Sequence, residues 1–250
     1  MPELPEVESV RRTIQPHVVG RRIRQALLDR ADVVVGEASP AALLQGARVA
    51  RLERLGKHLA IIADDGRVLV VHLGMSGQLF WLAPGGSLAN PSHVHARWRL
   101  VDGRGVDAGT LVFRDPRRFG GLWTLPDEVA LREHWKALGP DALDVPAAVL
   151  RQACAKSARA IKSVLLDQHV LAGVGNIYAD EACFGARIHP RRRARTLKPA
   201  EVEALARCVR EVLSRAIEHR GTTLRDFVDG EGRAGGYRLQ HAVYGRAGQA

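Results

Sequence analysis

The stretch ARVARLERLGKHLAIIADDGRVLVVHLG, Ala47 to Gly74, decides which fold the sequence favours. It is rich in aliphatic and β-branched residues, and Asp65-Gly66, a frequent hairpin-turn dipeptide, divides it into two strand-like runs. The segment ARWRLVDGRG, Ala96 to Gly105, repeats the pattern with Asp102-Gly103 at its turn. We therefore predict strands from Arg22 to about Leu125, arranged as a β-sandwich or a flattened barrel.

Helical periodicity flanks this strand-rich part. Residues 5–18 place apolar side chains three and four positions apart and are followed by Gly20, which predicts a short amphipathic helix. A longer helix is predicted from Thr196, its expected N-cap, to His219, just before Gly221. Its expected apolar stripe consists of Val202, Leu205, Ala206, Val209, Val212, Leu213, Ala216 and Ile217.

Strands and helices in separate blocks indicate an α+β protein with two domains. We predict an N-terminal β-sandwich domain over residues 1–128 and a helical domain over residues 129–250, with the boundary near residues 126–135. A cleft between a β-rich domain and a basic helical domain would accommodate a nucleic acid duplex.

The charge balance favours a polyanionic partner. Lys and Arg number 37 and Asp and Glu 27, a formal net charge of +10, which is most often associated with nucleic acid binding. The alternative is a basic protein without such a partner. Membrane-spanning apolar runs and a signal peptide are not seen, and the cysteines, Cys154, Cys183 and Cys208, lack CxxC spacing. We expect a cytoplasmic protein without a structural metal or a membrane partner.

The N-terminus, MPELPEVE, concentrates prolines and carboxylates where most chains carry little chemistry. Pro5, Glu6 and Glu8 suit the first turn of a helix, but Pro2 and Glu3 lie too far forward for that explanation. If Met1 is removed, Pro2 supplies a secondary α-amine that titrates near ~8 and can attack a sugar C1′ to give an iminium. Glu3 could then move the proton. The alternative is an inert N-terminal proline.

Two glycine-rich turns carry apolar or cationic tips. HLGMSGQL, His72 to Leu79, places Met75 between glycines after an apolar strand, and DPRRFGG, Asp115 to Gly121, presents Arg117 and Phe119. Such tips can enter a base stack or fill the gap of an everted nucleotide. From these residues alone, a methionine folded onto the sheet and an ordinary surface turn with a buried aromatic remain open.

Further stretches favour contacts with a phosphate backbone. LAGVGNIYADE, Leu171 to Glu181, has two glycines before Asn176 and a helical pattern after it, and we expect its backbone amides to bind a duplex phosphate. GARIHPRRRARTLK, Gly185 to Lys198, is a DNA footprint or a solvated basic loop. His93 and His95 alternate without a third metal ligand, and Lys57 is unremarkable on its own.

Together these stretches resemble the formamidopyrimidine-DNA glycosylase family, bacterial repair enzymes for oxidised purines. The motifs MPELPEVE, LGKHL, HLGMSG, DPRRFG, AGVGNIYADE and GTTLRDF occur in the order and spacing of that family, from the first residue to about Gly245. The resemblance implies an N-terminal β-sandwich with flanking helices and a C-terminal domain with a helix-two-turn-helix motif. It also implies a monomer that excises 8-oxoguanine and formamidopyrimidines from damaged duplex DNA and then cleaves the abasic site.

The resemblance also assigns roles to individual residues. Pro2 is implied as the nucleophile that forms a Schiff base at C1′, with Glu3 as its acid/base partner and Glu6 as a structural or auxiliary acid. Lys57 is implied to contact DNA and donate a proton during β-elimination. The implied gap-filling residues are Met75, Arg117 and Phe119. The implied phosphate contacts are His93, Lys162 and Asn176.

Two departures from the family pattern bear on these roles. Ser157 stands where a phosphate-binding Lys or Arg is usual, so that Lys156 or Arg159 would have to substitute. Family members continue past YGR into a four-cysteine zinc finger that supplies a DNA-contacting arginine, whereas this sequence reads YGRAGQA to Ala250. We expect no zinc in this chain and weaker DNA binding than in relatives with the finger. The alternative function is a non-catalytic or lyase-only DNA-damage-binding protein.

Overall fold

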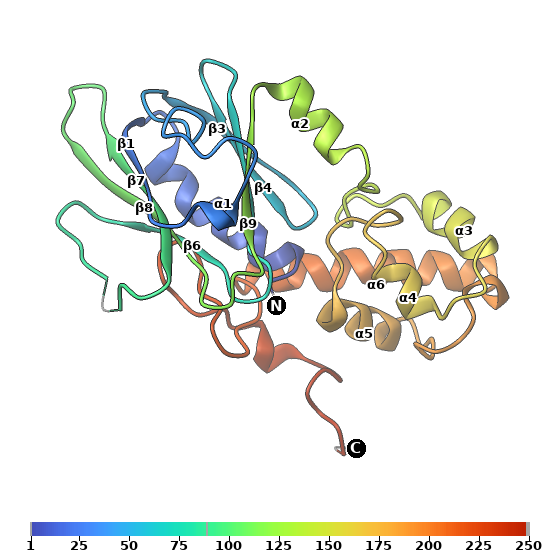
Figure 1. Ribbon diagram of the computed structural model, residues 1–250. Coiled ribbons are helices and arrows are strands. Elements are labelled where there is room, and N and C mark those ends of the chain that lie inside the picture. The colour runs from blue at the N-terminus through green and yellow to red at the C-terminus, as the bar shows by residue number, and fades with distance from the viewer. Residues whose placement is uncertain (1, 89, 249–250) are drawn as a thin grey trace.

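The computed structural model describes residues 2–88 and 90–248, whose strands form two packed sheets beside a group of helices (Figure 1). One sheet has the order β1-β7-β8-β6, made of Arg22–Leu28, Val94–Val101, Asp107–Arg114 and Gln78–Leu82. The other has the order β2-β9-β5-β4-β3, made of Val34–Val35, Gly121–Leu125, Val68–His72, His58–Ala63 and Val49–Leu55. All neighbours are antiparallel except β2 and β9. The predicted α+β class and the β-sandwich are confirmed.

The runs LAIIA and VLVV are apolar throughout because both faces of β4 and β5 are covered. Leu59, Ile61, Leu69 and Val71 point into the sandwich core, where they join α1 (Leu4–Val18) and the opposite sheet. The alternate residues pack beneath α2 (Glu128–Trp135) on the outer face, through Ala60, Ile62, Val68, Val70 and Leu131. A strand buried on two sides loses the polar alternation of a half-exposed strand.

The helical part is built around α6 (Pro199–Glu218). The other helices of this part are α3 (Ala147–Ala155), α4 (Ile161–Leu165) and α5 (Asn176–Gly185), with short 3₁₀ turns at Ala194–Thr196 and Tyr237–Gln240. A further 3₁₀ turn, Ala31–Val33, lies between β1 and β2 in the β-rich part. All eight residues of the predicted apolar stripe of α6 are buried. The expected N-cap was wrong: Thr196 lies in a 3₁₀ turn, and the helix begins after Lys198, whose backbone N–H donates to the Glu201 carboxylate (2.7 Å).

Two segments join the β-rich and helical parts. Helix α1 was predicted over residues 5–18 and is observed over Leu4–Val18; Leu4 packs in the helical core, whereas Val7 packs in the sandwich core. After α6 the chain returns to the sandwich, where Phe227 is buried. The division into domains at residue 128 stays a prediction. Within the described residues, no helix is both long enough and apolar enough to cross a membrane.

Candidate active site

Glu3 is buried where the two parts of the molecule meet. It caps α1, and its carboxylate accepts hydrogen bonds from the backbone N–H groups of Gly175 (2.7 Å) and Ile177 (2.9 Å) at the start of α5. A Cβ on Gly175 would lie 2.3 Å from the Glu3 carboxyl carbon, so that only glycine allows this approach. The expectation that these amides bind a duplex phosphate was wrong. The helix N-terminus binds an anion, but that anion is the protein's own carboxylate.

Glu6 lies one helical turn further along α1 and is equally buried. One carboxylate oxygen accepts the backbone N–H of Glu3 (2.7 Å), which completes a capping box. The other oxygen accepts the backbone N–H of Thr222 (2.7 Å) and the hydroxyl of Tyr178 (2.5 Å). Glu6 therefore ties the first turn of α1 to α5 and to the segment that follows α6.

Burial and charge shift the titration of this acid pair. Burial raises the pKa of Glu3 to about 7, and the neighbouring Glu6 carboxylate adds to the rise, whereas Lys57 and the backbone N–H donors oppose it. Burial also raises the pKa of Glu6. A carboxyl group that titrates near neutrality can both donate and accept a proton at working pH, which is a property of general acid–base groups.

Pro2 precedes the acid pair and lines a pocket of about 290 Å³. Met75 and Arg117 line the same pocket from the β-rich part, and Thr222, Leu224, Arg225, Asp226 and Phe227 line it from the segment after α6. The structure thus places Pro2 and two of the predicted gap-filling residues around one space. Met1, whose removal the chemistry of Pro2 requires, lies outside the described residues.

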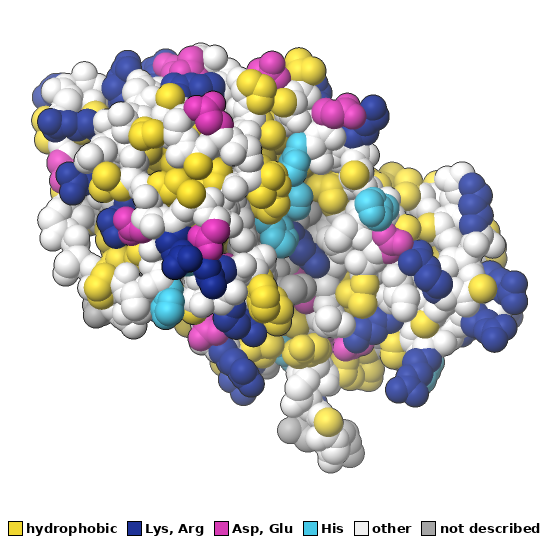
Figure 2. Space-filling model, viewed as in Figure 1, with side chains coloured by type: hydrophobic (Ala, Val, Ile, Leu, Met, Phe, Trp, Pro, Cys, Tyr) yellow, Lys and Arg dark blue, Asp and Glu magenta, His cyan; other side chains and the backbone are white. Residues whose placement is uncertain are grey.

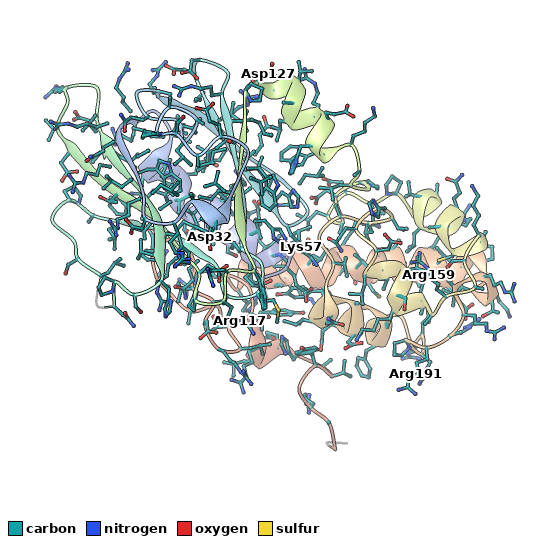
Figure 3. The ribbon with its side chains drawn as sticks, in the orientation of Figure 1. Asp32, Lys57, Arg117, Asp127, Arg159 and Arg191 are labelled. Atoms are coloured by element: carbon teal, nitrogen blue, oxygen red, sulfur yellow. The ribbon has the colours of Figure 1, made fainter. Side chains whose placement is uncertain are left out.

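Lys57 stands at the tip of the β3–β4 hairpin, at the junction of the two parts (Figure 3). Gly56 has a left-handed φ of +56°, and a Cβ there would lie 2.8 Å from that of Ala172, so that glycine permits the hairpin to touch the loop before α5. Burial lowers the pKa of Lys57, while the charges of Glu3 and Glu6 oppose this change.

A largely buried ion-pair cluster, consisting of Arg54, Asp141 and Glu8, fixes this hairpin. The Arg54 guanidinium donates to both carboxylate oxygens of Asp141 (2.5 and 3.1 Å) and to Glu8 (3.0 Å). The backbone N–H of Gly56 also donates to Asp141 (2.8 Å). Asp141 pairs in parallel with Ala172, just before the loop that holds Glu3. The cluster therefore joins the Lys57 hairpin, α1 and the Glu3-binding loop.

The predicted gap-filling residues are exposed at two adjoining turns. Met75 is 41% exposed and Phe119 is 59% exposed, and the Arg117 guanidinium lies 5.4 Å from the centre of the Phe119 ring. A methionine folded onto the sheet and a buried aromatic are both excluded. Arg117 lies at the lower edge of the β-rich part, on the side of the segment after α6 (Figure 3).

The buried Asp115 side chain forms hydrogen bonds to both turns. It accepts the Ser76 hydroxyl (2.6 Å) and the backbone N–H groups of Gly120 (2.7 Å) and Arg117 (3.3 Å). The turns also touch directly, since a Cβ on Gly74 would lie 2.3 Å from the Phe119 carbonyl carbon. The exposed side chains consequently stand on a rigid base.

The predicted phosphate contacts differ in how they are held. His93 is exposed with a left-handed φ of +64°, and Asn176 is exposed at the start of α5. Lys162 is half-buried, and its ammonium lies 2.8 Å from the Asp180 carboxylate. His95 is a buried structural residue that bonds the Asp115 carbonyl oxygen (2.8 Å). Lys and Arg side chains also gather along the outer edge of the helical part (Figure 2).

The cysteines do not fit the family's zinc finger. Cys154, Cys183 and Cys208 lie on α3, α5 and α6, and no cluster of three or more potential metal ligands occurs within residues 2–88 and 90–248.

Sequence reasoning missed Arg54, Asp141, Tyr178 and Asp115, and gave Thr222 no role of its own. Each makes its key contact with a residue far along the chain, and no local pattern marks such a pair. The local composition gave a weaker signal. Arg54 lies in a hairpin with many apolar residues, and Asp115 lies just before Arg117 and Arg118, so that both charges are expected to need partners.

Comparison with known proteins agrees with the geometry. The chain matches the models of the formamidopyrimidine-DNA glycosylase N-terminal domain over residues 1–122 and of its H2TH domain over residues 138–228. It is 45% identical to a formamidopyrimidine-DNA glycosylase of Symbiobacterium thermophilum, covering 100% of this chain and 81% of the relative. A relative from Escherichia coli O6:K15:H31 is 40% identical, with 100% and 90% covered.

Solved structures show the same likeness. The MutM (FPG) protein of Thermus thermophilus superposes with a TM-score of 0.83 at 38% identity, covering 99% of this chain and 88% of that one. A variant of Lactococcus lactis FPG in complex with DNA containing Fapy-dG gives a TM-score of 0.86 at 30% identity, covering 99% and 89%.

Proposed function

This chain belongs to the formamidopyrimidine-DNA glycosylase family, a group of DNA-binding repair glycosylases, and we propose that it excises oxidised purines from duplex DNA and cleaves the strand at the abasic site. The proposed substrates are 8-oxoguanine and formamidopyrimidines, and the proposed active form is a monomer. The observation that carries the proposal is the placement of Glu3, with a pKa raised to about 7, directly behind a proline that lines the pocket.

In the first proposed step the Pro2 nitrogen attacks C1′ of the damaged nucleotide. A bond forms between the nitrogen and C1′, the N-glycosidic bond breaks, and the base leaves with its bonding electrons and a proton. Protonation of O4′ opens the sugar and leaves an iminium at C1′. Glu3 is the proposed proton donor, because at its raised pKa a large fraction is protonated at neutral pH.

In the second proposed step a proton passes from C2′ to the Glu3 carboxylate, which became ionised when it protonated O4′, and the 3′ phosphate departs with the electrons of its C–O bond. The cationic iminium accepts electron density as the C–H bond breaks, so that the C–O bond to the phosphate can break without a strong base. Lys57 is the proposed proton donor and DNA contact. Burial lowers its pKa, which makes proton release easier than from an exposed lysine.

The remaining predicted residues are proposed to hold the distorted duplex. Met75, Arg117 and Phe119 would fill the space vacated by the everted nucleotide, and the exposure of all three side chains supports this role. His93, Lys162 and Asn176 are proposed to contact phosphates. Ser157 is half-buried, whereas Lys156 and Arg159 are exposed and are the proposed substitutes for the usual cation.

Borohydride trapping tests the proposed chemistry. The purified chain, with loss of Met1 verified by mass spectrometry, is incubated with duplexes containing 8-oxoguanine, an abasic site or no damage. We expect a covalent adduct with the first two and none with the third. A chain that retains Met1 is the control, and it should give no adduct because Pro2 then lacks a free amine.

The outcomes separate the alternatives. Trapping on the abasic site alone would establish a lyase without base excision. Measurable binding to both damaged duplexes without any adduct would contradict the proposal and would support the non-catalytic DNA-damage-binding protein.

A further inference from the structure

A buried chain of hydrogen bonds leads away from the acid pair to the segment after α6. The Tyr178 hydroxyl lies 2.5 Å from Glu6 Oε1 and 3.1 Å from Thr222 Oγ1, and Thr222 Oγ1 lies 3.1 Å from His241 Nε2. Each of the four side chains belongs to a residue no more than 6% exposed. The chain thus joins two titratable groups, Glu6 and His241, through two hydroxyl groups.

Hydroxyl groups donate one hydrogen and accept others, so that this chain can be satisfied in two ways. If His241 is cationic, its Nε2–H donates to Thr222, Thr222 donates to Tyr178, and Tyr178 donates to ionised Glu6. If His241 is neutral, every donor reverses, and protonated Glu6 donates to Tyr178. Both arrangements leave no member of the chain without a partner.

One transfer converts the first arrangement into the second. The Nε2 proton passes to Thr222 Oγ1, the Thr222 hydroxyl proton passes to Tyr178 Oη, and the Tyr178 proton passes to Glu6 Oε1. Three bonds to hydrogen break and three form, and an ion pair becomes a neutral pair. No other reactant is needed.

The surroundings of His241 suit a group that changes charge. Its Nδ1 lies 3.2 Å from the backbone carbonyl oxygen of Tyr244, which requires a hydrogen on Nδ1 in both states. Burial lowers the pKa of His241, the Glu181 carboxylate raises it, and Arg238 lowers it. The ring of Tyr237 lies 5.6 Å away, and Arg246 donates to the His241 backbone carbonyl oxygen.

The position of His241 is fixed by Glu181. This buried carboxylate accepts the backbone N–H groups of Ala242, Val243 and Tyr244 at 2.8–2.9 Å. Three charge-assisted bonds hold the backbone beside the imidazole. The segment that ends the relay is therefore attached directly to α5, the helix whose N-terminus binds Glu3.

We propose that Glu6, Tyr178, Thr222 and His241 form a proton relay that sets the charge of Glu6 and, through it, the proton affinity of Glu3. His241 and Thr222 are positioning residues, since they act on Glu3 only through Glu6. The relay itself stands on geometry, whereas its effect on excision rests on the proposed function.

The relay is tested by measuring the pKa of His241 by NMR in the free protein. His241→Asn identifies its signals. In the parent, Glu6→Gln should lower this pKa by ~0.5 units or more, because the anionic end of the chain is gone. In a Thr222→Val background the same substitution should have a clearly smaller effect, while Thr222→Ser restores it. Tyr244→Phe is the matched control and should change nothing, since its hydroxyl has no hydrogen bond within the described residues.

Equal shifts in the parent and in the Thr222→Val background would overturn the relay, because the coupling would then act through space. If Glu6→Gln does not fold, Tyr178→Phe replaces it, and an unchanged His241 pKa in that variant also overturns the relay. None of these readouts requires catalysis, so that a failure of the proposed function leaves the test intact. For an active chain, Thr222→Val should displace the pH–rate profile of excision, and Thr222→Ser should restore it.

Discussion

Glu3 and Glu8 lie five residues apart at the start of the same helix, and both are buried. Their pKa values are shifted in opposite directions from the ordinary value of a glutamate. The pKa of Glu3 is raised to about 7 by burial and by Glu6. Burial also opposes the ionisation of Glu8, but hydrogen bonds from Arg11 and Arg12 and the charge of Arg54 outweigh it and lower the pKa to about 2. The sequence context of the two residues is similar, and their partners are not.

The difference lets one helix hold both the proposed proton donor, Glu3, and a structural carboxylate, Glu8. Glu3 is bound by backbone N–H groups, which satisfy its oxygens without neutralising its charge, so that the proton stays easy to exchange. Glu8 is bound by guanidinium groups, which hold it ionised over the whole working pH range. The carboxyl group proposed to move protons and the carboxylate that holds two parts together therefore have different hydrogen-bond donors.

Replacing Glu3 should have the largest effect, and that effect should be on the rate of excision. Glu3→Gln retains the size of the side chain but removes the exchangeable proton, and general acid–base catalysis typically contributes 10²–10⁴-fold. We expect single-turnover excision of 8-oxoguanine to fall by at least ~100-fold. Quenched-flow or gel assays at saturating enzyme measure this rate.

Glu8→Gln is the paired variant on the same helix. It should weaken the fold while slowing excision by less than ~10-fold, because the arginines keep Glu8 ionised and without a proton to donate near neutral pH. If Glu8→Gln slowed excision as strongly as Glu3→Gln, the division of labour between the two carboxylates would be wrong.

Removing Asp141 should have the next largest effect, on stability. Asp141→Asn leaves the buried Arg54 guanidinium without its full counter-charge, a loss that typically costs 3–5 kcal/mol. We expect about 3 kcal/mol lower free energy of unfolding in urea titrations. Lys57 should also be displaced, because Asp141 holds the neighbouring Gly56 N–H.

The control lies on the same strand. Arg51 pairs with Glu128 at 2.6 Å, but both side chains are well exposed. Exposed pairs contribute about 0–1 kcal/mol, so Glu128→Gln should change stability by less than ~1 kcal/mol. Equal losses in Asp141→Asn and Glu128→Gln would show that the buried cluster is not a special support of the hairpin.

The two carboxylates should also give opposite pH dependences of stability. Between pH 4.5 and 7 the folded chain holds a Glu3 proton that the unfolded chain has released, so this contribution falls as pH rises, by about 3 kcal/mol in full. Glu8 stabilises the fold above pH 4.5, and its contribution falls as pH drops from 4.5 towards 2.

Urea titrations at several pH values isolate each term as the difference between parent and variant. Glu3→Gln should gain stability relative to the parent as pH rises from 4.5 to 7, and Glu8→Gln should gain as pH falls below 4.5. Parallel curves for either variant and the parent would mean that the corresponding pKa is not shifted.

The same comparison explains what sequence alone could predict. A period of 3.6 residues identified α1 and the stripe of α6, whereas runs of aliphatic and β-branched residues divided by Asp-Gly turns identified the strand-rich part. Glycine-flanked turns marked Met75 and Phe119 as candidates for exposed tips but left buried positions open, and both side chains are exposed in the structure. These features are local, and the chain near each residue contains the information.

Partners distant along the chain could not be predicted. The amides of Gly175 and Ile177 looked like a phosphate site, since nothing nearby shows that Glu3 occupies them. The difference in pKa between Glu3 and Glu8 depends on Arg54 and on α5, and tertiary packing brings both close to the two carboxyl groups. A pKa is a property of the folded neighbourhood, and local pattern does not determine it.

The smallest predicted effect concerns two of the proposed phosphate contacts, Lys162 and Asn176. Lys162 forms an ion pair with Asp180, whereas the Asn176 side chain makes no hydrogen bond within the described residues. If Lys162 contacts a phosphate, Asp180 competes for it. Asp180→Asn should then tighten binding to a duplex with a stable abasic-site analogue by less than ~5-fold, as expected for one partly exposed pair.

Lys162→Met should weaken binding and reduce the log–log salt slope by ~0.9. Fluorescence anisotropy across salt concentrations measures both, with Asn176→Ala as an uncharged comparison whose slope should not change. An unaltered salt slope in Lys162→Met would show that the Lys162 ammonium pairs with Asp180 and does not contact DNA. Lys162 would then have a structural role, as Glu8 does.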